Sequence, residues 1–313
     1  MNIFITGIAG FIGYHLAKKL SLNHNVIGLD NFNDYYDVSL KRQRAKDLNL
    51  EIIEKDIQDT ASLKDILKKN KIDCFIHLAA QAGVRHSLSH PDDYVNSNLL
   101  GFVSVLKALK EYPTKFVFAS SSSVYGDNKK TPFSETDETN SPVNLYGATK
   151  KSNEVLAYSY HSLYKIPMIG LRFFTVYGPF GRPDMAYFLF SNKITQNKPI
   201  DLFGYDKMQR DFTYIDDIIN GIISSIHLNT TFEIFNLGNN KPEKTTDLIK
   251  ILEKEFNKEA IINQMPVPQG EILTTYADID KSKKLLKFDP KTSLKDGIKE
   301  FTNWYKDYFN IQQ

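Results

Sequence analysis

The sequence predicts an α/β fold in which a doubly wound parallel sheet carries a smaller C-terminal α/β lobe. Three observations favour this fold: short apolar runs alternate with helical patterns through the first half, a glycine-rich turn follows the first run, and helix breakers become frequent after Tyr177. Near-continuous apolar strands separated by helices are typical of parallel sheets buried on both faces. A chain of 313 residues is long enough for about two domains.

The alternation predicts the elements in order. We expect strands over Asn2–Thr6, Asn25–Asp30, Leu50–Lys55, Asp73–Ala80, Lys115–Ser120 and Met168–Phe174. We expect helices over Gly10–Leu22, Thr60–Lys69, Asp92–Glu111, Leu145–Tyr164, Tyr214–His227, Thr245–Phe256 and Leu294–Phe309. Residues 1–175, with return elements at about 211–238, should form the sheet domain. Residues 176–313 should form mainly a lobe over the carboxyl edge of the sheet, where such sheets bind ligands.

The composition excludes several classes of protein. Hydrophobic residues make up 42% and charged residues 24%, as in ordinary globular proteins. The net charge of +2 is too small to indicate nucleic-acid binding. No apolar run approaches the roughly 18 residues that span a membrane, and the N-terminus enters a strand at once instead of resembling a secretory signal. The single cysteine, Cys74, fits a reducing compartment. We therefore expect a cytoplasmic protein with no membrane, nucleic-acid or metal site.

A glycine-rich segment links the first strand to the first helix. Gly7, Gly10 and Gly13 can provide the tight turn, close backbone approach and helix–strand packing that a pyrophosphate site needs. The spacing G-x-x-G-x-x-G differs from the G-x-G-x-x-G dinucleotide motif, so an ordinary glycine-rich turn is the alternative. The context of the following strands favours a Rossmann-type dinucleotide site.

Two acidic residues lie where the second and third strands end. A carboxylate at Asp30 can accept both ribose hydroxyls of NAD and would repel the 2′-phosphate of NADP. Three nearby cations could instead bind the 2′-phosphate, so NADP is the alternative cofactor: Lys41, Arg42 and Arg44. Asp56 has the position to face an adenine edge or to cap the helix after it.

Tyr146 and Lys150 form a Y-x-x-x-K pair on one face of a predicted helix. A nearby ammonium favours the phenolate, which can then act as a base. The alternative is an exposed helix pair with no catalytic role. Four consecutive serines at 120–123, at the end of the preceding strand, favour catalysis, because Ser121 can hydrogen-bond a substrate hydroxyl.

With these motifs the chain resembles the extended short-chain dehydrogenase/reductase superfamily, and the resemblance covers essentially the whole chain. More narrowly, it resembles the UDP-glucuronate 4-epimerases. The segments that carry the narrower resemblance are Asp30–Asp37 (DNFNDYYD), Ala80–Arg85 (AQAGVR), Arg172–Pro179 (RFFTVYGP) and Gly181–Ala186 (GRPDMA).

Carried over position by position, the resemblance assigns a role to each site residue. It implies a catalytic triad of Ser121, Tyr146 and Lys150. It implies contacts to NAD from Gly7, Gly10, Phe11, Ile12, Gly13, Asp30, Asn31, Asp56, Ile57, Ala79, Asn98 and Lys150. It implies that Arg210 binds the diphosphate and that Thr175 and Arg182 face the uronate carboxylate, with Ser122 and Ser123 as helpers. The sheet domain then binds NAD and the lobe binds mainly the UDP-sugar.

The resemblance implies NAD-dependent interconversion of UDP-glucuronate and UDP-galacturonate through a transient 4-keto sugar. Similar dehydratases carry Asp-Glu, and similar decarboxylases Ser-Glu, where this chain has Ser122 and Ser123. A serine cannot shuttle a proton as a carboxylate does, which favours simple epimerisation. A UDP-glucose/UDP-galactose 4-epimerase is the alternative.

Two further expectations concern the lobe and the assembly. Neutral-sugar epimerases place a second diphosphate arginine near residues 266–271, and this chain has none there. The helices Asp92–Glu111 and Leu145–Tyr164 carry apolar residues beyond one face, among them Leu99, Phe102, Val103, Leu106, Leu156, Tyr160 and Leu163. We expect them to pair across a two-fold axis as a four-helix bundle in a homodimer.

Overall fold

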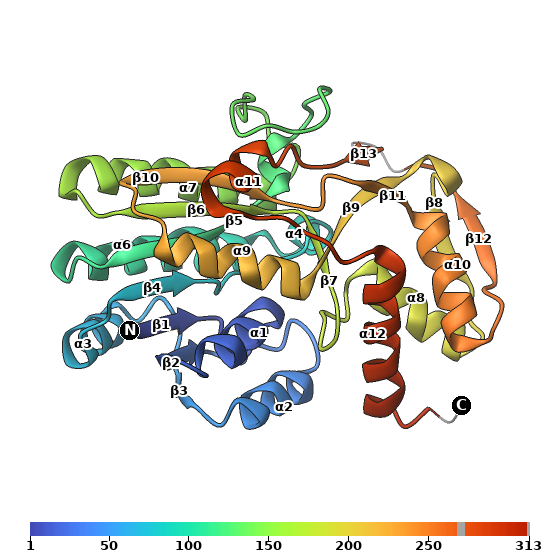
Figure 1. Cartoon of the computed structure of the whole chain (residues 1–313), viewed down its shortest axis with the longest axis horizontal. Coiled ribbons are helices and arrows are strands. Elements are labelled where there is room, and N and C mark those ends of the chain that lie inside the picture. Colours follow the sequence, from blue (N-terminus) through green and yellow to red (C-terminus); the bar gives the residue numbers. More distant parts are fainter. Residues whose placement is uncertain (268–272, 312–313) are drawn as a thin grey trace.

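A seven-stranded parallel sheet forms the centre of this computed structural model, which describes residues 1–267 and 273–311 (Figure 1). Its strands are β1 (Asn2–Thr6), β2 (Asn25–Asp30), β3 (Glu51–Glu54), β4 (Cys74–His77), β5 (Lys115–Ser121), β6 (Met168–Phe173) and β10 (Phe232–Leu237). They lie in the order β10-β6-β5-β4-β1-β2-β3. The order reverses between β1 and β4, and such switch points are where open α/β sheets bind ligands.

Alternate side chains of each strand enter two cores, one on each face of the sheet. Ile3 and Ile5 pack toward α1 (Phe11–Leu20) and α9 (Ile215–His227). Phe4, between them, packs with the other core, which receives side chains from three helices: α3 (Thr60–Asn70), α6 (Phe102–Glu111) and α7 (Leu145–Tyr164). A parallel sheet with helices on both faces is doubly wound, as predicted.

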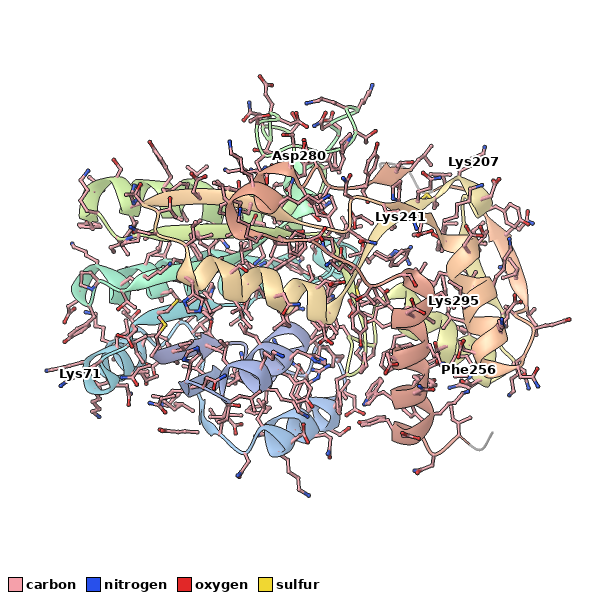
Figure 2. The ribbon with its side chains drawn as sticks, in the orientation of Figure 1. Lys71, Lys207, Lys241, Phe256, Asp280 and Lys295 are labelled. Atoms are coloured by element: carbon pink, nitrogen blue, oxygen red, sulfur yellow. The ribbon has the colours of Figure 1, made fainter. Side chains whose placement is uncertain are left out.

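The lobe lies beside the carboxyl ends of the strands (Figure 1). Its central strand β9 (Gln209–Tyr214) pairs with β7 (Thr175–Tyr177), β11 (Pro242–Lys244) and β13 (Thr274–Thr275). A second pair joins β8 (Ile200–Phe203) to β12 (Ile262–Met265). The lobe helices are α8 (Ala186–Thr195), α10 (Thr245–Phe256) and α12 (Leu294–Tyr308), and α11 (Asp280–Leu286) packs near β10. Lys71 and Lys207 are exposed and lie at opposite edges of the molecule (Figure 2).

Aromatic packing joins the lobe to the sheet domain at Phe180. Its ring centroid lies 4.8 Å from that of Tyr14 in α1 and 5.0 Å from that of Trp304 in α12. Phe180 has φ of +54°, so the chain turns sharply there before it enters the lobe. This contact fixes the start of the loop that carries Arg182.

All six predicted strands are present, with ends that differ by at most three residues. The predicted helix Asp92–Glu111 is wrong in its first half, because the chain forms α5 (Pro91–Tyr94) and then a π-helical segment, η1 (Val95–Gly101), before α6. The sequence patterns did not indicate α2 (Val38–Leu48), whose inward residues include Lys41 and Arg44 as well as leucines. The domain boundary at residue 175 stays a prediction. Among the described residues, no helix is both long and apolar enough to cross a bilayer.

Candidate active site

The turn after β1 is so tight that side chains at its glycines would collide with the backbone. Gly7 has φ of +73°, and a Cβ atom there would lie 2.7 Å from the amide nitrogen of Ala79. A Cβ atom on Gly13 would lie 2.1 Å from the carbonyl oxygen of Gly7, because α1 begins directly against the turn. The turn lines a pocket, so the N-terminus of α1 is available to an anionic group such as a pyrophosphate.

The Asp30 carboxylate lies at the end of β2 beside this turn. It accepts hydrogen bonds from the backbone N–H groups of Ala9 (3.0 Å) and Phe32 (2.9 Å). Burial raises the pKa of Asp30, although these N–H groups and the Lys41 ammonium oppose the rise. Asp30 lines the pocket, where its carboxylate is placed to accept hydrogen bonds from ribose hydroxyls.

The three cations near this carboxylate are engaged in other contacts. Lys41 donates to the backbone oxygen of Asn33 at 2.6 Å, and Arg42 forms an ion pair with Glu54 at 2.6 Å. Arg44 is fully buried and donates to backbone carbonyl groups of two loops. With all three cations held in this way, the site favours NAD over NADP.

Ten of the twelve residues predicted to contact the cofactor line this one pocket; the exceptions are Asp56 and Asn98. The Asp56 carboxylate accepts hydrogen bonds from the Asn31 side chain and from the N–H of Gln58, both at 2.8 Å. The Asn98 amide is bonded to both backbone groups of Gln81. The cofactor contacts of these two residues stay predictions.

Gln81 is a pocket residue that the sequence analysis missed. Its side chain is buried, and its Nε2 atom has no hydrogen-bond partner within the part of the chain that the structure describes. A buried donor without a partner costs free energy, so a pocket with such a donor fits a ligand that brings an acceptor. The glycine turn, Asp30 and this amide together fit a dinucleotide such as NAD.

Tyr146 and Lys150 lie one turn apart at the start of α7, and both line the pocket. Burial raises the pKa of Tyr146, whereas a hydrogen bond with Ser121 and the charge of Arg182 oppose the rise. Burial lowers the pKa of Lys150 to about 8, and its Nζ donates to the carbonyl oxygen of Ala119 at 2.9 Å. The ammonium is therefore bonded to β5 rather than to the phenol, and further positive charge is needed to hold a phenolate at neutral pH.

Arg182 reaches the same pocket from the loop after β7. Its Nε and Nη2 atoms donate to the two carboxylate oxygens of Asp184 at 3.0 and 2.5 Å. The Tyr35 hydroxyl donates to the same carboxylate at 2.9 Å. Burial opposes the charge, but Asp184 raises the pKa of Arg182, which stays a cation. Arg182 thus brings a guanidinium to the pocket, close enough to Tyr146 to act on its pKa, and its contact with a substrate carboxylate stays a prediction.

The other residues predicted to contact the substrate lie outside the set that lines this pocket. Ser122 and Ser123 begin the 3-10 turn η2 (Ser122–Tyr125), directly after β5, and Thr175 begins β7. Arg210 is on β9, and its Nη1 donates to the backbone oxygens of Gln209 (2.9 Å) and Leu273 (3.1 Å). The roles of these four stay predictions. Most of the segment 266–271, where a second arginine is missing, lies outside the described residues.

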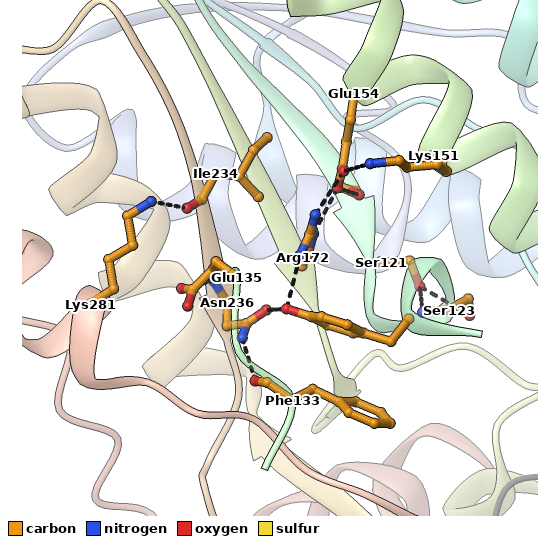
Figure 3. A network of polar contacts seen from close by, with 12 residues as sticks. Ser121, Ser123, Phe133, Glu135, Lys151, Glu154, Arg172, Ile234, Asn236 and Lys281 are labelled. Carbon is orange, nitrogen blue, oxygen red and sulfur yellow. Dashed lines mark hydrogen bonds and ion pairs between the residues drawn. The ribbon is translucent and has the colours of Figure 1, made fainter. Parts of the chain in front are cut away.

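A buried polar network behind the serines was not predicted (Figure 3). Glu154, one turn after Lys150, accepts from Arg172 at 2.8 and 2.9 Å and from Ser120 at 2.6 Å. Arg172 also donates to the Tyr125 hydroxyl at 3.0 Å. The network ties α7 to β5, β6 and η2, so it fixes the elements that carry the triad. The signal for it in the sequence is Arg172, a charged residue inside the otherwise apolar strand β6.

The chain is similar to proteins of one family. Residues 3–238 match the model described as the NAD dependent epimerase/dehydratase family. An uncharacterised protein of Methanocaldococcus jannaschii is 48% identical, over 97% of this chain and 96% of that protein. UDP-glucuronate 4-epimerase 3 of Arabidopsis thaliana is 43% identical, over 99% of this chain and 77% of that protein.

A solved structure resembles this fold closely. It is the UDP-glucuronic acid 4-epimerase of Bacillus cereus in complex with UDP-glucuronic acid and NAD. The TM-score is 0.93 at 37% identity, and the alignment covers 98% of this chain and 100% of that one. The likeness therefore extends over both the sheet and the lobe.

Proposed function

Because the chain belongs to the NAD-dependent epimerase/dehydratase family, we propose that it is a UDP-glucuronate 4-epimerase that uses NAD. One observation carries the choice of a uronate: the Arg182 guanidinium lines the same pocket as Tyr146 and acts on its pKa. A guanidinium binds a carboxylate in bidentate form, and UDP-glucose has no carboxylate to offer. The likeness to the UDP-glucuronate 4-epimerases of Arabidopsis thaliana and Bacillus cereus supports the same substrate.

Each residue of the proposed triad has a different role in the reaction at C4 of the sugar. When bound, NAD would supply the acceptor for the C4 hydride and the hydride donor for its return to the same carbon. Tyr146 removes the C4 hydroxyl proton and later returns it, and Ser121 holds the hydroxyl by a hydrogen bond. Lys150 adds positive charge to the base and contacts the cofactor. The turn at Gly7 and Gly13 would hold the cofactor's pyrophosphate and Asp30 an adjacent ribose, together with the other predicted contact residues.

The 4-keto sugar formed on this route is a β-keto acid, which loses CO2 readily. We propose that Arg182 and Thr175 hold its carboxylate in the ring plane, where the bond to CO2 overlaps poorly with the carbonyl group. Ser122 and Ser123 assist by hydrogen bonding. The Arg210 guanidinium binds the diphosphate, about which the sugar turns to present its other face.

The test is a comparison of substrates in an arginine variant. Arg182→Ala should weaken the binding of UDP-glucuronate about ten- to a hundredfold, the size of one charge-assisted interaction. It should leave the affinity for UDP-glucose almost unchanged. Arg42→Ala is the matched control, because Arg42 is exposed and paired with Glu54. Titration of both nucleotide sugars checks this. Equal weakening of both sugars would show that Arg182 serves the diphosphate or the fold, and would remove the support for a uronate.

We also propose a cytoplasmic homodimer formed through η1 and α7. Exposed apolar side chains on these elements, among them Val95, Leu100, Val155 and Leu163, suit a helix-to-helix contact with a second copy. Two of the predicted contact residues are wrong, because Phe102 and Leu106 are buried in the core of their own chain. Sedimentation at micromolar concentration should give a dimer mass, and Leu100→Glu should give a monomer; a monomeric wild type would contradict the assembly.

A further inference from the structure

Two side chains beside Arg182 have no role in the proposed function. Asp184 comes from the same loop as Arg182, and Tyr35 from the loop after β2. Both Asp184 oxygens accept from the guanidinium, and one of them also accepts from Tyr35. The residue expected to bind a substrate carboxylate is therefore already paired with a carboxylate of its own chain.

Asp184 is held in place by its contacts with Arg182 and Tyr35. Arg182, Tyr35 and Met185 line the pocket, whereas Asp184 does not. A Cβ atom on Gly83 would lie 2.3 Å from the Tyr35 hydroxyl and 3.5 Å from an Asp184 oxygen, so the Gly83 loop lies directly against the pair. Burial opposes its charge, but Arg182 and the hydrogen bonds lower the pKa of Asp184, which stays anionic.

The guanidinium keeps donors for a second carboxylate. An arginine has five N–H donors, and Asp184 takes one from Nε and one from Nη2. The Tyr35 hydroxyl also interacts with Arg182, and we infer that the remaining N–H groups are available to a carboxylate in the pocket that Arg182 lines. Two carboxylates on one guanidinium repel each other, so each one is held more weakly than it would be alone.

We propose, on the basis of the proposed function, that Asp184 is a counter-charge that weakens the hold of Arg182 on the sugar carboxylate. The sugar must turn over between removal and return of the hydride, and its carboxylate must leave Arg182 for that step. A buried guanidinium without a partner would bind the carboxylate tightly and delay the turn. With Asp184 bonded to it, Arg182 stays paired while the sugar moves. Asp184 is thus a positioning residue that acts through Arg182.

The test removes the charge of Asp184 and keeps its shape. Asp184→Asn should bind UDP-glucuronate about tenfold more tightly, the effect of roughly one charge interaction, with UDP-glucose unchanged within about twofold. Its turnover with UDP-glucuronate should fall, because release of the carboxylate is slower. Asp34→Asn is the control, since Asp34 is an exposed carboxylate of the same loop as Tyr35. Calorimetric titration of the NAD-loaded proteins gives the affinities.

Unchanged or weaker binding of UDP-glucuronate by Asp184→Asn would overturn the proposal and show that Asp184 only orients Arg182. If that variant does not fold, Tyr35→Phe tests the proposal instead. It removes the hydroxyl that donates to Asp184, so that Asp184 pairs more strongly with Arg182. It should weaken UDP-glucuronate about two- to fivefold, in the direction opposite to Asp184→Asn; no change or tighter binding overturns the proposal. Failure of the wild type to convert UDP-glucuronate would refute the proposed function, and the titrations would still decide the effect of Asp184.

Discussion

At the scale of single residues, the surroundings of Tyr146 work against the charge that its role requires. Burial raises its pKa, and the Lys150 ammonium is bonded to Ala119 instead of the phenol. A pKa lowered by about three units from 10 needs roughly 4 kcal/mol of differential stabilisation. Lys150, Arg182 and the positive nicotinamide ring of bound NAD must supply it together. The protein without cofactor therefore holds Tyr146 as a neutral phenol.

Tyr146→Phe should lose at least about a hundredfold in turnover, because only the acid/base group is removed. Binding of NAD and of UDP-glucuronate should stay near that of the wild type, since one hydroxyl is lost from an otherwise intact pocket. Initial rates, with affinities from titration, check this. Near-normal turnover would show that the base is a different group.

Lys150→Met should raise the free energy of unfolding of the cofactor-free protein at pH 7, although it abolishes turnover. The pKa of Lys150 is about 8 in the folded state, and an unfolded lysine titrates near 10.4. The folded state therefore binds fewer protons between these values, and wild-type stability rises with pH across that window. The variant should be more stable by about 1–3 kcal/mol at pH 7, and the difference should shrink toward pH 10. Urea unfolding at the two pH values measures it; a difference independent of pH would contradict the pKa.

Candidate catalytic and cofactor-binding residues could be predicted from the sequence, but the residues that contact them in the fold could not. Tyr146, Lys150 and Asp30 stand in motifs whose spacing has a chemical reason, so they could be predicted. Gln81 lines the pocket only because of the fold, and Asp184 accepts a hydrogen bond from Tyr35, which is distant in sequence. Nothing in the local pattern shows that Asp184 faces Arg182 instead of solvent.

At the scale of elements, periodicity predicted the strands and most helices but could not predict η1. A π-helical segment keeps an amphipathic pattern close to that of an α-helix, so its extra residue per turn leaves no clear mark. The reason for it is tertiary: the Asn98 side chain is bonded to Gln81 and to Thr149 of α7. The segment thereby joins the loop after β4 to the helix that carries Tyr146.

Asn98→Ala should lower the free energy of unfolding by about 2–4 kcal/mol, because it leaves the backbone N–H and carbonyl of Gln81 without partners. Asn96→Ala is the matched control, since Asn96 is exposed on the same π-helical segment. Its effect should stay within about 0.5 kcal/mol. Chemical unfolding of the two variants gives the comparison, and equal losses would show that the Asn98 contacts contribute little.

At the scale of the whole molecule, the site exists because three parts of the chain meet at one switch point. The sheet domain supplies the glycine turn and Asp30, α7 supplies Tyr146 and Lys150, and the loop that enters the lobe supplies Arg182. The doubly wound sheet could be predicted from the alternation of strands and helices. The arrangement of the lobe could not, because its short strands pair with segments far away in sequence, as β9 does with β13.

The central claim is that the hydride leaves C4 and returns to the same carbon. The most direct measurement is an NMR time course of UDP-glucuronate that carries deuterium at C4, incubated with the purified protein. We expect UDP-galacturonate that retains the deuterium at C4, without accumulation of reduced cofactor, because NAD is regenerated in each turnover. Loss of the label to solvent, or no conversion of UDP-glucuronate, would contradict this account.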